Sequence, residues 1–167
     1  MSAGAAEAEA RRDMLRHTLA TLAYRGGKAL RGAPEGFAHF RFRAGARTRT
    51  PVEILAHVGD LLDWAVWMTR GEHRWVEVAP ATWEEGVERF FAGLAALDAA
   101  LVSDDRRAHP PEKIFQGPIA DALTHVGQIA MLRGMAGSPV RGENYFRADI
   151  VAGRVGPEQA EPRREFD

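Results

Sequence analysis

The sequence contains no cysteine, and this absence removes several kinds of chemistry. It excludes disulfide bonds, catalysis by a cysteine thiolate and zinc sites with cysteine ligands. Serine is scarce, and Ser2, Ser103 and Ser138 all lie outside the Gly-x-Ser-x-Gly setting of a nucleophilic serine. The glycine-rich motifs that cradle nucleotide phosphates are also missing. Serine hydrolases and nucleotide-binding enzymes are therefore disfavoured.

Strong charge of one sign and long apolar runs are missing as well. The formal net charge is -1, with 46% hydrophobic and 27% charged residues. This balance gives no overall attraction to nucleic acid or to an anionic membrane. No apolar run approaches the roughly 18–20 residues that span a bilayer, and the first residues lack the apolar centre of a signal peptide. We expect a cytoplasmic protein that binds neither nucleic acid nor membrane.

Apolar residues at helical spacing predict four helices. The first is expected from about Ala6, with a stripe of Met14, Leu15, Leu19 and Leu22, and to end between residues 26 and 30. The second and third have clear starts, because Thr50 with Glu53 and Thr82 with Glu85 have the spacing of capping boxes. The buried stripes of these two helices are expected at Ile54, Leu55, Val58, Leu61, Leu62, Ala65 and at Trp83, Val87, Phe90, Leu94, Leu97, Leu101.

The end of the third helix is expected at Ser103-Asp104-Asp105 and the following Pro110-Pro111. The fourth helix is expected to open at Gly117-Pro118 and to end near Gly137. Its apolar residues are Ile119, Leu123, Val126, Ile129, Ala130 and Leu132.

The predicted fold is all-α, a four-helix bundle in one domain over residues 1–167. A long connection over residues 31–49 separates the first two helices and permits a crossover. Its Phe37, Phe40 and Phe42 are expected to pack against the core. We expect a short helix around 146–151, no strand pair, and loose ends at 1–7 and 157–167.

Two of the predicted helices carry polar residues among apolar ones. Asp121 and His125 are four residues apart and therefore share a helix face, which Gln128 extends. His57 lies in line with Leu61 on the second helix. If the two helices face each other, His57, Asp121 and His125 form a metal site with two histidines and one carboxylate. Three protein ligands leave positions open for water or substrate, as in catalytic metal sites.

Simpler interpretations of these residues stay open. A histidine on an apolar face is often only a hydrogen-bonded core residue, and the Asp-x-x-x-His spacing is common by chance. Asp121 falls in the first turn after Pro118, where a carboxylate complements the helix dipole. A metal-bound histidine also needs a partner for its second nitrogen, and Glu53, Asp60 or Gln128 could provide one.

Two further patterns have alternative interpretations. The segment FRFRAGARTR interleaves aromatics with Arg41, Arg43, Arg47 and Arg49, as nucleic-acid-binding segments do, but the overall charge balance favours a solvated loop. Four tryptophans gather around the junction of the second and third helices, which suggests packing in the core or an interface first and lining of a pocket second. They are Trp64, Trp67, Trp75 and Trp83.

Three segments together resemble the DinB-like (DinB/YfiT) superfamily of metal-binding four-helix bundles. They are RTPVEILAHVGDLLDW, GPIADALTHVGQIAMLRG and GENYFRADIVAGRVG, and the resemblance extends from about Leu15 to Gly156. It implies a divalent metal ion, often nickel or zinc, with His57 and His125 as ligands. The third ligand of the family is usually histidine. The aspartate at 121 is a departure that makes the site harder and favours zinc, manganese or iron, or leaves Asp121 only to orient His125.

The resemblance also implies a class of reaction. Characterised members include transferases and isomerases that use low-molecular-weight thiols such as bacillithiol or mycothiol, so we expect a small-molecule substrate and a metal-activated thiol. The alternatives are a metal-dependent hydrolase and a non-catalytic, metal-binding or stress-related bundle. The resemblance also favours a homodimer. No catalytic residue beyond the metal ligands can be named from the sequence.

Overall fold

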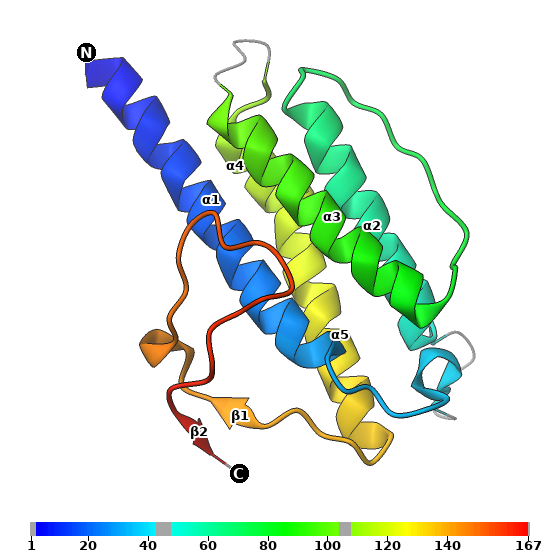
Figure 1. Cartoon of the computed structure of the whole chain (residues 1–167). Helices are drawn as coiled ribbons and strands as arrows, with labels where there is room; N and C mark the ends of the chain where they lie inside the picture. The colour runs from blue at the N-terminus through cyan, green and yellow to red at the C-terminus, as the bar shows by residue number, and fades with distance from the viewer. Residues whose placement is uncertain (1–2, 43–47, 104–107, 167) are drawn as a thin grey trace.

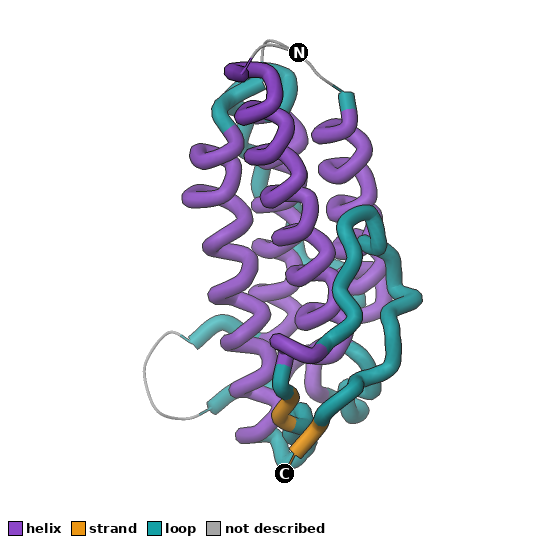
Figure 2. Tube along the Cα trace, turned by 90° about the vertical axis from the view of Figure 1, so that its left-hand side faces the viewer, coloured by secondary structure: helices purple, strands orange, loops and turns teal. Residues whose placement is uncertain are grey.

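The computed structural model describes residues 3–42, 48–103 and 108–166, and the described chain is mostly helical. The long helices are α1 (Ala3–Leu30), α2 (Pro51–Met68), α3 (Trp83–Val102) and α5 (Ala120–Met135), with the short α4 (Pro111–Ile114) before α5. They lie side by side along most of their length (Figures 1 and 2). The prediction of an all-α fold is confirmed. Within the described ranges, no helix is both long and apolar enough to cross a membrane.

Helix α1 runs through Gly26 and Gly27 without a break and ends at Leu30. At Gly26 the lack of a side chain allows close packing, because a Cβ there would lie 2.4 Å from the Phe90 ring of α3. Leu15, Leu19 and Leu22 are buried as predicted. Met14 is 68% exposed, so its assignment to the buried stripe is wrong.

Both predicted capping boxes are present. The Thr50 side chain accepts the Glu53 N–H at the start of α2, and Thr82 accepts the Glu85 N–H at the start of α3. The glutamates bond back to the threonine N–H groups, at 2.6 and 2.9 Å. The stripe predicted for α2 is entirely buried, and that of α3 is buried from Phe90 onward.

The last long helix begins earlier than predicted. Pro111 opens α4, which continues through a π-helical turn, η2 (Phe115–Ile119), into α5. Gly117-Pro118 was expected to start the helix, but Pro118 lies inside the π turn. Proline lacks an N–H and breaks the usual ladder of an α-helix, and a widened turn is one way a helix absorbs such a defect. Asp104 and Asp105, expected to end α3, lie outside the described residues.

The packing order differs from the chain order. Helix α1 contacts α3 and α5, and α2 contacts α3 and α5, so α1 and α2 face each other across the core. Figure 1 shows α2 and α3 running in the same direction, opposite to α1 and α5. The long connection after α1 joins two helices that are not among the main contacting pairs, whereas the connection that returns along the helices is the one between α2 and α3. The connection after α1 includes the 3-10 turn η1 (Phe37–His39).

The phenylalanines of that connection differ in burial. Phe37 is 2% exposed, and Phe40 packs partly buried against the core. Phe42 is 44% exposed, which contradicts its predicted packing. Arg43 and Arg47 of the arginine-rich segment lie outside the described residues.

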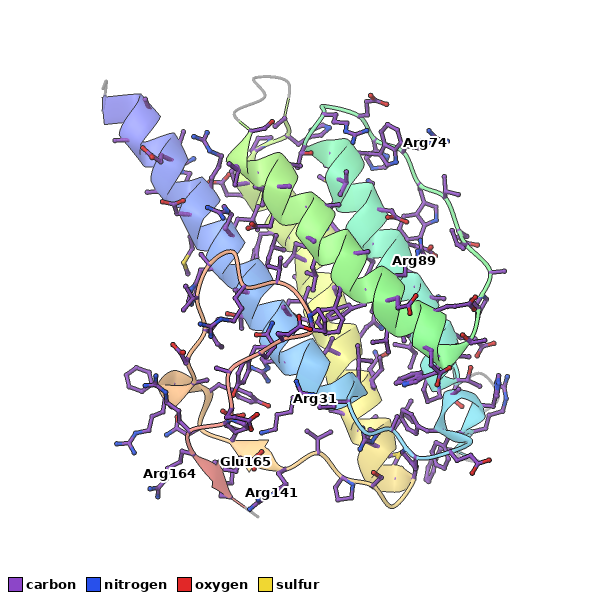
Figure 3. All side chains as sticks on the ribbon, viewed as in Figure 1. Arg31, Arg74, Arg89, Arg141, Arg164 and Glu165 are labelled. Carbon is purple, nitrogen blue, oxygen red and sulfur yellow. The ribbon has the colours of Figure 1, made fainter. Side chains whose placement is uncertain are left out.

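A second long connection, residues 69–82, joins α2 to α3. Because these helices are parallel, it must return along their whole length, and Figure 1 shows it doing so. Asp60 of α2 holds it by accepting the Val78 N–H at 3.2 Å. Arg89 of α3 donates to the Ala56 carbonyl at 3.1 Å and to Asp60 at 2.8 Å, which joins α3, α2 and this connection. Arg89 and Arg74, which lies on the connection, are labelled in Figure 3.

The C-terminal segment is fastened to α1. Strands β1 (Gly142–Glu143) and β2 (Glu165–Phe166) pair antiparallel, although no strand pair was predicted. The Glu143 carboxylate accepts hydrogen bonds from Tyr24 and Lys28, both at 2.7 Å, and Lys28 also contacts Glu165 at 2.6 Å. Burial and the bond to Glu143 raise the pKa of Tyr24. Residues 157–167, expected to be loose, thus include a paired strand.

The helix expected around residues 146–151 is shorter in the structure. It is the single 3-10 turn η3 (Tyr145–Arg147), which the Asn144 side chain caps by accepting the Phe146 N–H. The segment between η3 and β2 lies across α1 (Figure 1).

Candidate metal centre

His57, Asp121 and His125 come together where α2 packs against α5. Each offers one ligand atom, and these atoms all lie within 4.8 Å of one another. Nε2 of His57 is 3.6 Å from one carboxylate oxygen of Asp121, and Nε2 of His125 is 3.5 Å from the other. The imidazole rings meet edge to face, with centroids 4.9 Å apart. The structure thus brings together the three residues that the sequence singled out.

Helix geometry explains the arrangement. Asp121 and His125 stand one turn apart on α5, so their side chains project from the same face. His57 occupies a half-buried position at the edge of the buried stripe of α2, the helix that contacts α5 directly. Two neighbouring ligands from one helix and a third from its partner therefore follow from this helix packing.

The spacing of the ligand atoms fits one small ion. Zinc binds histidine nitrogen and carboxylate oxygen at about 2.0–2.2 Å, which places two ligands of a tetrahedral ion about 3.4 Å apart. The two histidine–carboxylate separations, 3.6 and 3.5 Å, are close to this value. The two separations involve different oxygens of Asp121, and the three ligand atoms spread over up to 4.8 Å, so the side chains must draw together to hold one ion.

The site is buried on one side and open on the other. The side chains of His57 and His125 are 20% and 12% exposed, whereas that of Asp121 is 47% exposed. Solvent therefore reaches the carboxylate side, where a further ligand could approach an ion.

The surroundings of His57 favour its neutral form. Burial lowers the pKa of His57 below its ordinary value of 6.5, and the charges of Arg49 and His125 act in the same direction. The Asp121 carboxylate opposes them without cancelling them. A neutral imidazole is the form that binds metal, so His57 is prepared for ligation at neutral pH.

His125 is oriented by Gln128, one of three predicted partners. Nδ1 of His125 lies 2.8 Å from Oε1 of Gln128. An amide oxygen can only accept, so this bond places the proton on Nδ1 and leaves the Nε2 lone pair facing Asp121. The prediction that Glu53 or Asp60 could be such a partner is wrong. Glu53 caps α2 through Thr50, and Asp60 bonds to Arg89 and the 69–82 connection.

The helix-dipole interpretation of Asp121 loses its basis. Helical backbone runs continuously from Pro111, so Asp121 lies about three turns beyond the first helical residue. The preceding N–H, that of Ala120, already bonds to the carbonyls of Gly117 and Phe115. Asp121 has no free helix terminus to complement.

Aromatic residues form one wall of the site. Lining of a pocket was the second of the two interpretations of the tryptophans drawn from the sequence. Trp75, on the 69–82 connection, meets His57 edge to face at 5.6 Å and Trp64 at 5.8 Å. His73 lies 5.1 Å from Trp64. The tryptophans do not form one cluster, because Trp67 contacts Arg70 and Arg74, and Trp83 packs on Phe37. In the sequence, the sign of an aromatic residue on the His57 face of α2 was the position of Trp64, seven residues after His57.

A pocket of about 140 Å³ adjoins the centre and shares His57 as a lining residue. Its other lining residues include Arg49, Glu53 and Asp60, and Glu77 and Val78 of the 69–82 connection. A larger pocket of about 280 Å³ lies between α1 and α4, away from the three candidate ligands. The smaller pocket is the one that a ligand of the metal could enter.

The donor set fits a divalent cation. Two neutral imidazoles and one carboxylate suit zinc, iron, manganese or nickel by ligand type, and the geometry does not select among them. No protein-family model, curated protein or solved structure matches the chain.

Proposed function

We propose that the protein is a metal-dependent enzyme built on a four-helix bundle, in which His57, Asp121 and His125 hold one divalent ion. The observation that carries the proposal is the convergence of three ligand atoms from two helices within 4.8 Å. The half-exposed Asp121 and the adjoining pocket support a catalytic rather than a closed structural site, because a closed site leaves no room for substrate.

The chemistry follows from the donor set. A bound divalent ion supplies Lewis acidity, which lowers the pKa of a coordinated thiol or water. Gln128 holds His125 in the tautomer that leaves Nε2 free. Trp75 packs against the His57 ring. These residues would therefore hold and orient the ligands of the ion.

We infer that the activated group is a low-molecular-weight thiol and that the reaction is a transfer or isomerisation. The resemblance of the HVGDLLDW and THVGQIAMLRG segments to the DinB-like superfamily supports this choice. A chain without cysteine needs a thiol from outside for such chemistry. Hydrolysis by an activated water is the related alternative on the same ligands.

Metal content tests the proposal directly. The protein is purified without a histidine tag, and bound metals are measured by plasma mass spectrometry. We expect near-stoichiometric divalent metal in the wild type and its loss in His57→Ala and His125→Ala. His17→Ala is the matched control, because His17 is exposed on α1, outside the three-residue cluster, and it should keep the metal. Equal trace metal in all four proteins would refute the site.

A second experiment separates an enzyme from a metal-binding protein. The metal-loaded protein is mixed with small thiols and a model electrophile, and consumption of the electrophile is followed. We expect turnover that requires both the thiol and His125. Full metal occupancy without turnover for any thiol, or with water as the only nucleophile, would favour the non-catalytic bundle or the hydrolase.

A further inference from the structure

The pocket beside His57 has a charge pattern that points to the kind of molecule it binds. From this pattern we infer that Arg49 holds the carboxylate of a small acidic ligand whose other end reaches the metal ligands. This inference rests on the proposed function and adds to it a substrate class and a residue that selects it.

Two of the carboxylates that line the pocket are already neutralised. Asp60 accepts hydrogen bonds from Arg89 and from the Val78 N–H, at 2.8 and 3.2 Å. Glu53 accepts from both the N–H and the hydroxyl of Thr50, at 2.6 and 2.8 Å, and Arg41 lies 3.8 Å from it. These groups hold the fold together and do not need a ligand.

Arg49 differs from these residues. Within the described part of the chain, its guanidinium makes no hydrogen bond or ion pair. It lines the pocket together with His57, and its charge helps lower the pKa of both His57 and Glu53. It immediately precedes Thr50, the cap of α2. A guanidinium presents parallel N–H groups that match a carboxylate in a two-pronged contact. The Arg49 guanidinium, which lines the pocket, is therefore the group that would bind a carboxylate.

The remaining lining charge restricts the ligand further. Glu77 of the 69–82 connection also lines the pocket, and its negative charge would disfavour a second negative group on the ligand. The volume of about 140 Å³ accommodates a fragment of only a few non-hydrogen atoms. A short chain with one carboxylate and a metal-binding head, such as a mercapto acid, meets both limits.

The first test compares two thiols on the cobalt(II)-loaded protein. Binding of 3-mercaptopropionate and of the neutral 2-mercaptoethanol is followed by the sulfur-to-cobalt absorption band. We expect Arg49→Gln to weaken 3-mercaptopropionate about tenfold and to change 2-mercaptoethanol less than twofold. Arg49→Lys should bind 3-mercaptopropionate more tightly than Arg49→Gln does, but less tightly than the wild type does. Arg41→Gln removes the same charge from a residue outside the pocket lining, and it should leave both affinities near those of the wild type.

The second test needs no metal. Propionate and propanol are titrated into the metal-free protein, and backbone amide shifts around residues 49–57 are followed by NMR. Propionate should shift them in the wild type and in Arg41→Gln, but not in Arg49→Gln, and propanol should not. This result would support carboxylate binding by Arg49 even if the protein bound no cobalt. A failure to bind cobalt would count only against the proposed function.

Either experiment can overturn the inference. It fails if Arg49→Gln weakens both thiols equally, or if Arg41→Gln has the same effect as Arg49→Gln. It also fails if propionate shifts are unchanged by Arg49→Gln, whatever the metal content.

Discussion

At the scale of single residues, the bond between His125 and Gln128 has the clearest consequence for metal binding. Groups that orient a metal-bound histidine typically contribute 10–100-fold in affinity. We predict that Gln128→Ala weakens zinc binding about tenfold, because the His125 ring loses its fixed tautomer and orientation. Gln128→Glu, which still accepts from Nδ1, should bind zinc at least as tightly as the wild type. Competition against a chromophoric chelator measures both. Unchanged affinity in Gln128→Ala would mean that the ring needs no such partner.

Asp121 is the residue whose role the sequence left open. As a ligand it contributes an oxygen and a negative charge, so Asp121→Asn should weaken zinc binding much more than Gln128→Ala does. Asp121→His replaces one ligand by another and should restore much of the affinity, with a shift of preference towards nickel. If Asp121 only orients His125, Asp121→His would give no recovery. The same chelator competition, run with zinc and with nickel, distinguishes the two roles.

The protonation of His57 gives a prediction on pH. Since burial and the Arg49 charge lower its pKa in the folded protein, the unfolded chain binds this proton more readily. Acid therefore destabilises the fold through His57, and the loss grows as pH falls below about 6.5. In NMR titrations of the metal-free protein, the His57 midpoint should lie below 6.5, and Arg49→Gln should raise it. A midpoint above 6.5 would mean that the Asp121 charge dominates.

At the scale of the helices, the capping boxes hold the starts of α2 and α3. We predict that Thr50→Ala lowers the free energy of unfolding by about 1 kcal/mol, the usual contribution of such a cap. Thr124→Ala is the control, because Thr124 is exposed on α5 and its hydroxyl only bonds back to the Ala120 carbonyl. Urea denaturation should show little change for it. Equal losses in both variants would argue against a specific cap.

The local elements were predictable because their signals are local. Thr50 and Glu53 fix the start of α2, and repeated apolar residues fix which face is buried, so His57 could be placed on its helix. The shared face of Asp121 and His125 follows from spacing alone. The start of the last helix was missed because Pro111 and Pro118 look alike in sequence, and only packing decides which proline is absorbed inside the helix.

At the scale of the whole molecule, the long connections placed the parts of the site that the sequence could not assign. Trp75 and Glu77 reach the centre only because α2 and α3 run parallel and their connection must return along them. Helix direction depends on contacts between distant residues, and no local motif encodes it. The sequence showed Arg49 as part of an arginine-rich segment, but only the three-dimensional structure shows that it lines the same pocket as His57.

The attachment of the C-terminal segment to α1 is also a property of the whole molecule. The Glu143 side chain is fully buried between Tyr24 and Lys28. We predict that Glu143→Ala costs about 3 kcal/mol of unfolding free energy, since it leaves the buried Tyr24 hydroxyl without its acceptor and the Lys28 ammonium with only Glu165. Glu165→Ala should cost less, because Lys28 keeps its bond to Glu143. Thermal and urea unfolding measure both, and equal effects would contradict the central role of Glu143.

The half-exposed Asp121 has a kinetic consequence. Because Asp121 faces bulk water while the two imidazoles are largely buried, an ion held by the three proposed ligands would enter or depart without any helix separating. Exchange of such an ion with the medium would then be limited by breaking its bonds to the three side chains and not by opening of the helices.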